Sequence, residues 1–246
     1  MDLQLYELAM VVLITLAGSY LQSVTGFGFG IIAMIFLPRL LLYTEANVLA
    51  SILSTLTSAL VVISMYRKIN WRNLFFPLLG STVANYLAIS FVKSAKNETL
   101  ILILGVALFL LSIYFFFYSE RIKIRPTWYA GLFAGMISGV MSGLFSISGP
   151  PMVIYYMQSE KQAERYLATI SSYFVLSGMI TVSMKALSGF VTANVLIGVG
   201  LGVVGMIVGA YLGRLTRGKM NPQLIRKVIY GVMACSGIIN VVTALR

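Results

Sequence analysis

One uncharged stretch decides the fold of this chain: residues 8–38 read LAMVVLITLAGSYLQSVTGFGFGIIAMIFLP. A helix that crosses a bilayer needs about 20 apolar residues, so these 31 residues are too many for one helix and too few for two. Glycine recurs at every second position from Gly26 to Gly30, which lines no single helical face. We therefore predict a helix over residues 5–24, a break, and a short return helix over residues 30–43.

A second uncharged stretch has the same plan: residues 126–158 read PTWYAGLFAGMISGVMSGLFSISGPPMVIYYMQ. Its regular pattern is interrupted between Gly149 and Pro151, which predicts helices over residues 128–144 and 151–158. Irregular backbone survives at membrane depth only where protein covers it or where it lines a cavity. Both breaks should therefore lie inside the protein.

The whole chain has the composition of a membrane protein. Of its 246 residues, 59% are apolar, 10% are charged and none is histidine, whereas a soluble domain has roughly 45–50% apolar and 25% charged residues. The alternating strands of an outer-membrane barrel are absent from the pattern. We expect an all-α polytopic membrane protein, with six further uncharged stretches at 46–66, 73–92, 99–119, 166–184, 186–213 and 228–245.

The two halves of the sequence resemble each other. Ala17-Gly18 and the glycine-rich break reappear at a spacing near 118 residues as Ala134-Gly135 and the second break. The register continues from residues 48–52 to residues 166–170. We predict a duplication with repeats at 1–122 and 123–246, which together form one membrane domain.

The distribution of Lys and Arg over the loops predicts that the halves are inverted, because cytoplasmic loops are enriched in these residues. Parallel halves would put 8 basic residues inside and 10 outside, whereas inverted halves put 13 inside and 5 outside. Each repeat then has a broken helical hairpin, re-entrant or of two short spans, followed by three transmembrane helices, and both termini lie outside. The predicted cytoplasmic loops are 67–72, 119–125, 159–165 and 214–227, and the outer cations are Arg39, Lys93, Lys96, Lys185 and Arg246.

The net charge of +11 reflects basic loops that orient the protein in the membrane, not a surface that binds nucleic acid, because the cations lie between apolar spans. The expected partners are the lipid bilayer and a small anion, with no nucleic acid, and a homodimer is compatible with this. The lone Cys235 allows no intrachain disulfide. The first seven residues carry two acids and no base, unlike a cleaved signal peptide, so we expect them to be retained.

Matching broken helices in inverted repeats are typical of the midplane site of a transporter. Each return helix presents free backbone N–H groups and the positive end of its dipole, which attract anions. Neither break contains a lysine, so we expect neutral donors to hold the anion. The candidate substrate-binding residues are Gln22, Ser23, Thr25, Gly26, Gly28, Gly30, Ser138, Ser142, Ser146, Ser148 and Gly149, with Asn85 in a later span.

Other features have a structural interpretation. Glycines at every fourth position are typical of close helix packing; they are Gly131, Gly135, Gly139, Gly143, Gly205, Gly209 and Gly213. For Gly143, packing and binding both stay open. We interpret Asn47 and Asn194 as amides that join helices. No carboxylate or histidine lies deep in a span, so we expect proton coupling through the substrate's own protonation or through water.

An enzyme is not expected, because a chain without histidine lacks a Ser-His or Cys-His nucleophile. Without clustered acids or several cysteines the sequence predicts no metal site and no cofactor. A membrane scaffold stays open as an alternative, since glycine-rich surfaces would serve it too. Paired breaks distinguish the two, because a scaffold does not need them.

The break segments resemble the two signature segments of the sulfite exporter TauE/SafE family. The resemblance lies in residues 21–30, ending at Pro38, and in residues 131–139, leading to residues 148–151. It implies an inner-membrane permease that exports sulfite, an organosulfonate such as sulfoacetate, or a related organic acid. A permease for another carboxylate or inorganic anion is the alternative.

Overall fold

The computed structural model describes residues 5–117, 125–216 and 222–244. The predicted boundary between the halves, after residue 122, lies outside these residues. The same holds for five of the cations that entered the charge comparison, which are Arg121, Lys123, Arg217, Lys219 and Arg246.

The described residues form an all-helical protein, as predicted. Seven of the helices are long and apolar enough to cross a membrane, and no strand occurs in the described ranges. The first half contains α1 (Leu5–Thr25), α2 (Phe29–Phe36), α3 (Tyr43–Met65), α4 (Phe75–Ser94) and α5 (Asn97–Phe117). The second half contains α6 (Trp128–Phe145), α7 (Gly149–Ser159), α8 (Ala163–Leu187), α9 (Ala193–Thr216) and α10 (Pro222–Ala244).

Both predicted breaks are present, and each is followed by a short helix. With 8 residues in α2 and 11 in α7, these helices are about 12 and 16 Å long, too short for a hydrocarbon core of about 30 Å. The prediction that the first return helix reaches residue 43 is wrong. Pro38 lacks an N–H and restricts the residue before it, so α2 ends at Phe36 and a 3₁₀ turn follows to Arg39.

The glycine stripes pack helices closely, as predicted. Along α6, a Cβ added at Gly135 or Gly139 would collide with the backbone of α4 at Pro77 or Ser81. Along α9, the same holds for Gly209, which meets the backbone of α1. Only glycine permits this approach of two backbones.

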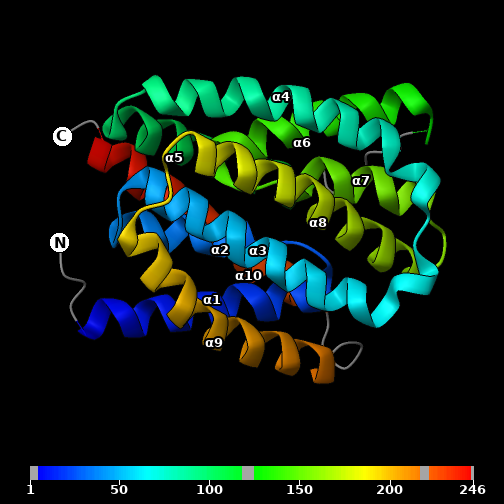
Figure 1. The fold of residues 1–246 in the computed structure, drawn as a ribbon, viewed down its shortest axis with the longest axis horizontal. Coiled ribbons are helices and arrows are strands. Elements are labelled where there is room, and N and C mark those ends of the chain that lie inside the picture. The colour runs from blue at the N-terminus through cyan, green and yellow to red at the C-terminus, as the bar shows by residue number, and fades with distance from the viewer. Residues whose placement is uncertain (1–4, 118–124, 217–221, 245–246) are drawn as a thin grey trace.

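The helices form layered pairs (Figure 1). In this view α4 and α6 lie along one side, α1 and α9 along the opposite side, and α3 and α8 cross between them. The α3–α8 pair is antiparallel, because Ser51 contacts Lys185 whereas Thr55, further along α3, lies against the earlier Gly178. Since α3 and α8 hold the same place in the two halves, this direction supports the inverted arrangement, which stays a prediction.

The first turn of α1 and the last turn of α10 lie at the same end of the bundle (Figure 1). On which side of the membrane this end lies stays a prediction. The centre of the protein encloses the return helices, and six of the eight residues of α2 are buried. The irregular backbone at the start of α2 is therefore covered by protein, as a membrane interior requires.

Candidate functional site

The first break is built by two glycines with left-handed backbone. Gly26 has a φ of +86° and Gly28 a φ of +106°, a conformation that glycine adopts without steric cost. The hydroxyl of Thr25 fixes the turn, since its Oγ1 lies 3.0 Å from the Leu21 carbonyl and 2.7 Å from the Phe27 carbonyl. The chain then reverses and α2 begins at Phe29.

The second break turns at Ser146, whose φ of +56° is unusual for a residue other than glycine. Its N–H donates to the Ser142 carbonyl over 2.9 Å at the end of α6. The Ser138 hydroxyl donates to the Ser148 carbonyl over 2.7 Å and accepts from the Tyr173 hydroxyl over 3.0 Å. Ser138 therefore holds the shape of the break.

The two breaks lie against each other. A Cβ added at Gly30 would lie 1.9 Å from the carbonyl oxygen of Ser146, and one added at Gly149 would lie 2.8 Å from Cδ2 of Phe27. Glycine at position 30 lets the backbones of α2 and the second break touch, and glycine at position 149 leaves room for the Phe27 side chain. Segments more than 100 residues apart in the sequence thus form one site.

A small cavity of about 10 Å³ lies where the breaks meet, with room for about one water molecule. The first turns of α2 and α7 both open onto it, and N–H groups in a first turn have no partner within their own helix. In α7 these are the N–H groups of Gly149 and Met152, because Pro150 and Pro151 have none. The positive ends of both helix dipoles therefore face the cavity. It is lined by Gln22, Phe27, Gly28, Gly30, Ile31, Ser54, Ser146, Ile147, Ser148, Gly149 and Phe174.

Six of the predicted site residues line this cavity: Gln22, Gly28, Gly30, Ser146, Ser148 and Gly149. The other six do not line it: Ser23, Thr25, Gly26, Ser138, Ser142 and Asn85. Asn85 of α4 donates to the Thr181 hydroxyl of α8, which is a packing contact. Substrate contact stays a prediction for all twelve.

A buried lysine, which sequence reasoning placed in an outer loop, contacts the second break. Lys185 is fully buried near the end of α8. Its Nζ lies 2.7 Å from Ser51 Oγ, 3.0 Å from Ser146 Oγ and 3.2 Å from the Ser142 carbonyl, and it also donates to Asn47 Oδ1. Lys185 therefore does not count among the outer loop cations, and it lies beside the second break although neither break contains a lysine. That neutral donors hold the anion stays a prediction.

Asn47 joins the helices around this lysine, as its interpretation as a connecting amide predicted. Its Nδ2 donates to the Leu144 carbonyl over 2.5 Å, and the Tyr43 hydroxyl donates to the same oxygen over 2.5 Å. The Ser146 hydroxyl lies 2.6 Å from the Asn47 carbonyl. Sequence reasoning did not include Asn47 in the site, although it contacts both Ser146 and Lys185.

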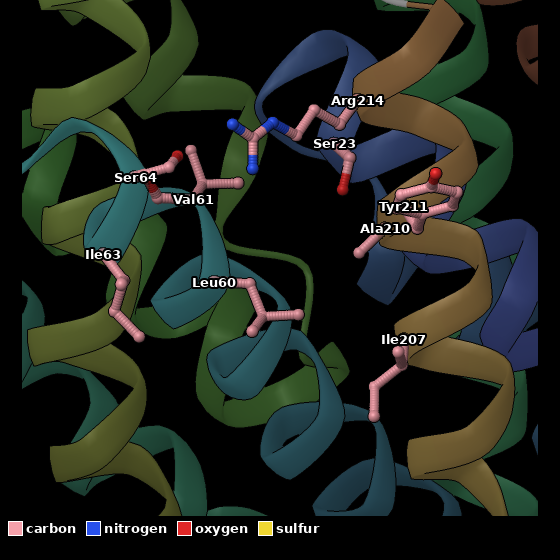
Figure 2. A pocket seen from close by; sticks show the side chains of 9 residues that line it. All are labelled: Ser23, Leu60, Val61, Ile63, Ser64, Ile207, Ala210, Tyr211 and Arg214. Carbon is pink, nitrogen blue, oxygen red and sulfur yellow. The ribbon is translucent and has the colours of Figure 1, made fainter.

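A groove of about 490 Å³ lies beside the first break, between α3 and α9 (Figure 2). The Ser23 hydroxyl points into it from α1, and Arg214 extends from α9 toward α3 across one end (Figure 2). Within the described part of the chain Arg214 makes no ion pair. The remaining lining residues are Leu60, Val61, Ile63, Ser64, Ile207, Ala210 and Tyr211.

Comparison with known proteins gives two matches. The model of the family described as sulfite exporter TauE/SafE matches residues 10–239. A probable sulfite/organosulfonate exporter TauE from Cupriavidus necator is 28% identical over 232 residues, which cover 88% of this chain and 87% of that protein. No solved structure matches the chain.

Proposed function

We propose, from the premise that the chain belongs to the sulfite exporter TauE/SafE family, that it carries sulfite or an organosulfonate out across the inner membrane. The relative from Cupriavidus necator is named as a probable exporter of these compounds. The two breaks are the proposed binding site, with the anion held between them.

The observation that carries this proposal is that two helix N-termini face one cavity. A sulfite or sulfonate group has three oxygens that accept hydrogen bonds, and helix N-termini bind such oxyanions through backbone N–H groups. The hydroxyl of Ser148 adds a donor on the same wall. Broken helices from two repeats hold substrates in this way in other transporter folds.

The cavity of about 10 Å³ is smaller than a sulfite ion, so the breaks must separate to admit it. The α1–α2 hairpin belongs to one half and the α6–α7 hairpin to the other. A movement of one half against the other would widen the cavity without breaking either hairpin.

The groove beside the first break is the proposed approach to this site. It is lined by both Arg214 and Ser23, and the neighbour of Ser23 in the sequence, Gln22, lines the cavity. Arg214 belongs to the loop region predicted to be cytoplasmic. A cation at the mouth of a groove attracts an incoming anion.

A permease for another carboxylate or inorganic anion uses the same donors and is the second candidate. The apposition of two breaks does not favour a scaffold, which needs close packing but no helix N-termini directed at a cavity. Binding and transport measurements with one set of anions can distinguish both alternatives from sulfite export.

The test measures thermal stabilisation of the purified protein by sulfite, sulfoacetate, thiosulfate, acetate and chloride, and flux of the stabilising anions in proteoliposomes. We expect sulfite and sulfoacetate to stabilise the protein and to be transported. Preference for acetate or chloride would favour the second candidate. No stabilisation and no flux with any anion would favour the scaffold.

A matched pair of variants tests whether the break is the site. Gly28→Ala and Gly189→Ala both place a side chain at a positive φ, +106° and +83°, so both carry similar backbone strain. Only Gly28 lines the cavity, and a Cβ there would lie 2.6 Å from Leu21, whereas nothing lies within 4 Å at Gly189. We expect Gly28→Ala to lose transport and Gly189→Ala to keep it. Equal transport by the two variants would exclude the first break as the site.

A further inference from the structure

We propose that Lys185 is a proton-binding site coupled to the anion, so that the anion crosses the membrane together with a proton held by the protein. The proposal rests on the function proposed above and adds the coupling ion to it. It follows from the surroundings of the lysine, from the hydrogens that its network can supply, and from its contact with Ser146.

The surroundings of Lys185 contain no opposite charge. Its four partners are neutral oxygens from α3, from α6 and from the second break, and in the described residues it makes no ion pair. The ionisable groups of α3 nearest in sequence to Asn47 have other partners: Tyr43 donates to the Leu144 carbonyl, and Glu45 accepts from Thr192 and Asn194. Two polar side chains reach this part of α8 from neighbouring helices, Asn85 from α4 and Ser142 from α6. Both are neutral. A cation enclosed in this way carries a desolvation penalty that no opposite charge offsets, and an ionisable residue inside a membrane protein points to function.

The network accommodates both protonation states of the lysine. The Asn47 amide oxygen and the Ser142 carbonyl can only accept, so Nζ donates to both in either state. The Ser51 hydroxyl can accept a third hydrogen from an ammonium, or it can donate to the lone pair of a neutral amine. The Ser146 hydroxyl can donate to the Asn47 carbonyl in both states. Rotation of one hydroxyl hydrogen at Ser51 therefore suffices when a proton arrives or leaves.

Ser146 connects this proton site to the cavity. It lines the cavity and also lies 3.0 Å from Nζ of Lys185. An anion in the cavity supplies the missing negative charge and favours the ammonium form, whereas the empty site favours the neutral amine. By linkage, protonation of Lys185 raises the affinity for the anion by the same factor.

The step balances in charge. A proton from solution binds to Nζ when a monoanion enters, and it returns to solution when the anion leaves on the other side. The pair is neutral, so transport of a monoanion would move no net charge.

Calorimetric titration of ethanesulfonate into the purified protein, in two buffers with different heats of ionisation, measures this coupling. A sulfonate does not titrate near neutral pH, so any proton taken up binds to the protein. We expect uptake of up to one proton per anion, with affinity falling by up to about tenfold per pH unit as the pH rises. Lys93→Met, which removes an exposed lysine of α4, is the control and should behave as the wild type.

Two variants locate the proton. Lys185→Arg keeps a permanent charge and should bind the anion without proton uptake. Ser51→Ala removes the donor to the neutral amine but leaves three acceptors for the ammonium, so proton uptake should fall while binding persists. Ser51→Ala removes a single oxygen atom, whereas Lys185→Arg adds volume at a fully buried position, so a cooperative melting transition of the Lys185→Arg protein is required before its titration.

Loss of uptake in Lys185→Arg together with reduced uptake in Ser51→Ala would support the proposal. Wild-type binding without proton uptake would overturn it, and so would unchanged uptake in a folded Lys185→Arg variant. If the wild type binds neither ethanesulfonate nor sulfite, the proposed anion-transport function fails, and the coupling fails with it.

Discussion

Replacement of Gly30 by alanine tests the contact between the two breaks. The added Cβ would lie 1.9 Å from the carbonyl oxygen of Ser146, and ordinary contacts begin at 3.4 Å. Either α2 or the second break must therefore move by about 1.5 Å, the difference of these distances. The obstacle is backbone on both sides, so a rotamer change cannot relieve it.

The cost follows from these distances. Overpacking of this kind costs about 1–3 kcal/mol, partly offset by the about 0.5–1 kcal/mol that alanine gains over glycine in a helix. The net cost is at most about 2.5 kcal/mol, so we expect the melting temperature to fall by up to about 10 °C. Displacement of the α2 amides should also weaken sulfite binding by about tenfold or more.

Thermal unfolding in detergent, with and without sulfite, measures both effects. The matched control is Gly200→Ala in α9, where an added Cβ meets nothing within 4 Å. This control should melt at or slightly above the wild-type temperature and keep its stabilisation by sulfite. If Gly30→Ala behaves as Gly200→Ala does in both measurements, the reasoning about the apposed breaks is refuted.

Two further predictions concern topology and approach. In a cysteine-free background, single cysteines at Ser94 and Thr216, at the ends of α4 and α9, should react with impermeant reagents from opposite sides of the membrane; reaction from one side would contradict the inverted arrangement. Arg214→Gln should slow anion flux several-fold at low ionic strength and less at high ionic strength, because salt screens the attraction. Lys161→Gln, which removes an exposed loop cation, should leave the flux unchanged. An equal effect of both substitutions would contradict the proposal that the anion approaches through the groove.

The breaks could be predicted from the sequence because their signals are local. Alternate glycines and paired prolines interrupt a helix wherever they stand, and a stretch of 31 residues has only a few ways to fit a bilayer. The error at the end of α2 is local too, because Pro38 disfavours a helix that continues through it to residue 43.

The buried lysine could not be predicted in the same way. Lys185 separates two uncharged stretches, and a lysine there is usually a loop residue. Its burial depends on α3, on α6 and on the second break, which supply all four of its partners from positions 39 to 138 residues away. Only the packing of α8 against them decides that the charge lies inside.

The most direct test of the account is a crystal structure with 2-bromoethanesulfonate, in which anomalous scattering locates the bromine and ordinary density locates the sulfonate. The account predicts the sulfonate between residues 28–30 and residues 146–149, within hydrogen-bond distance of the first-turn N–H groups of α2 and of the Gly149 N–H in α7. A sulfonate bound only at Arg214, or one far from both breaks, would contradict it.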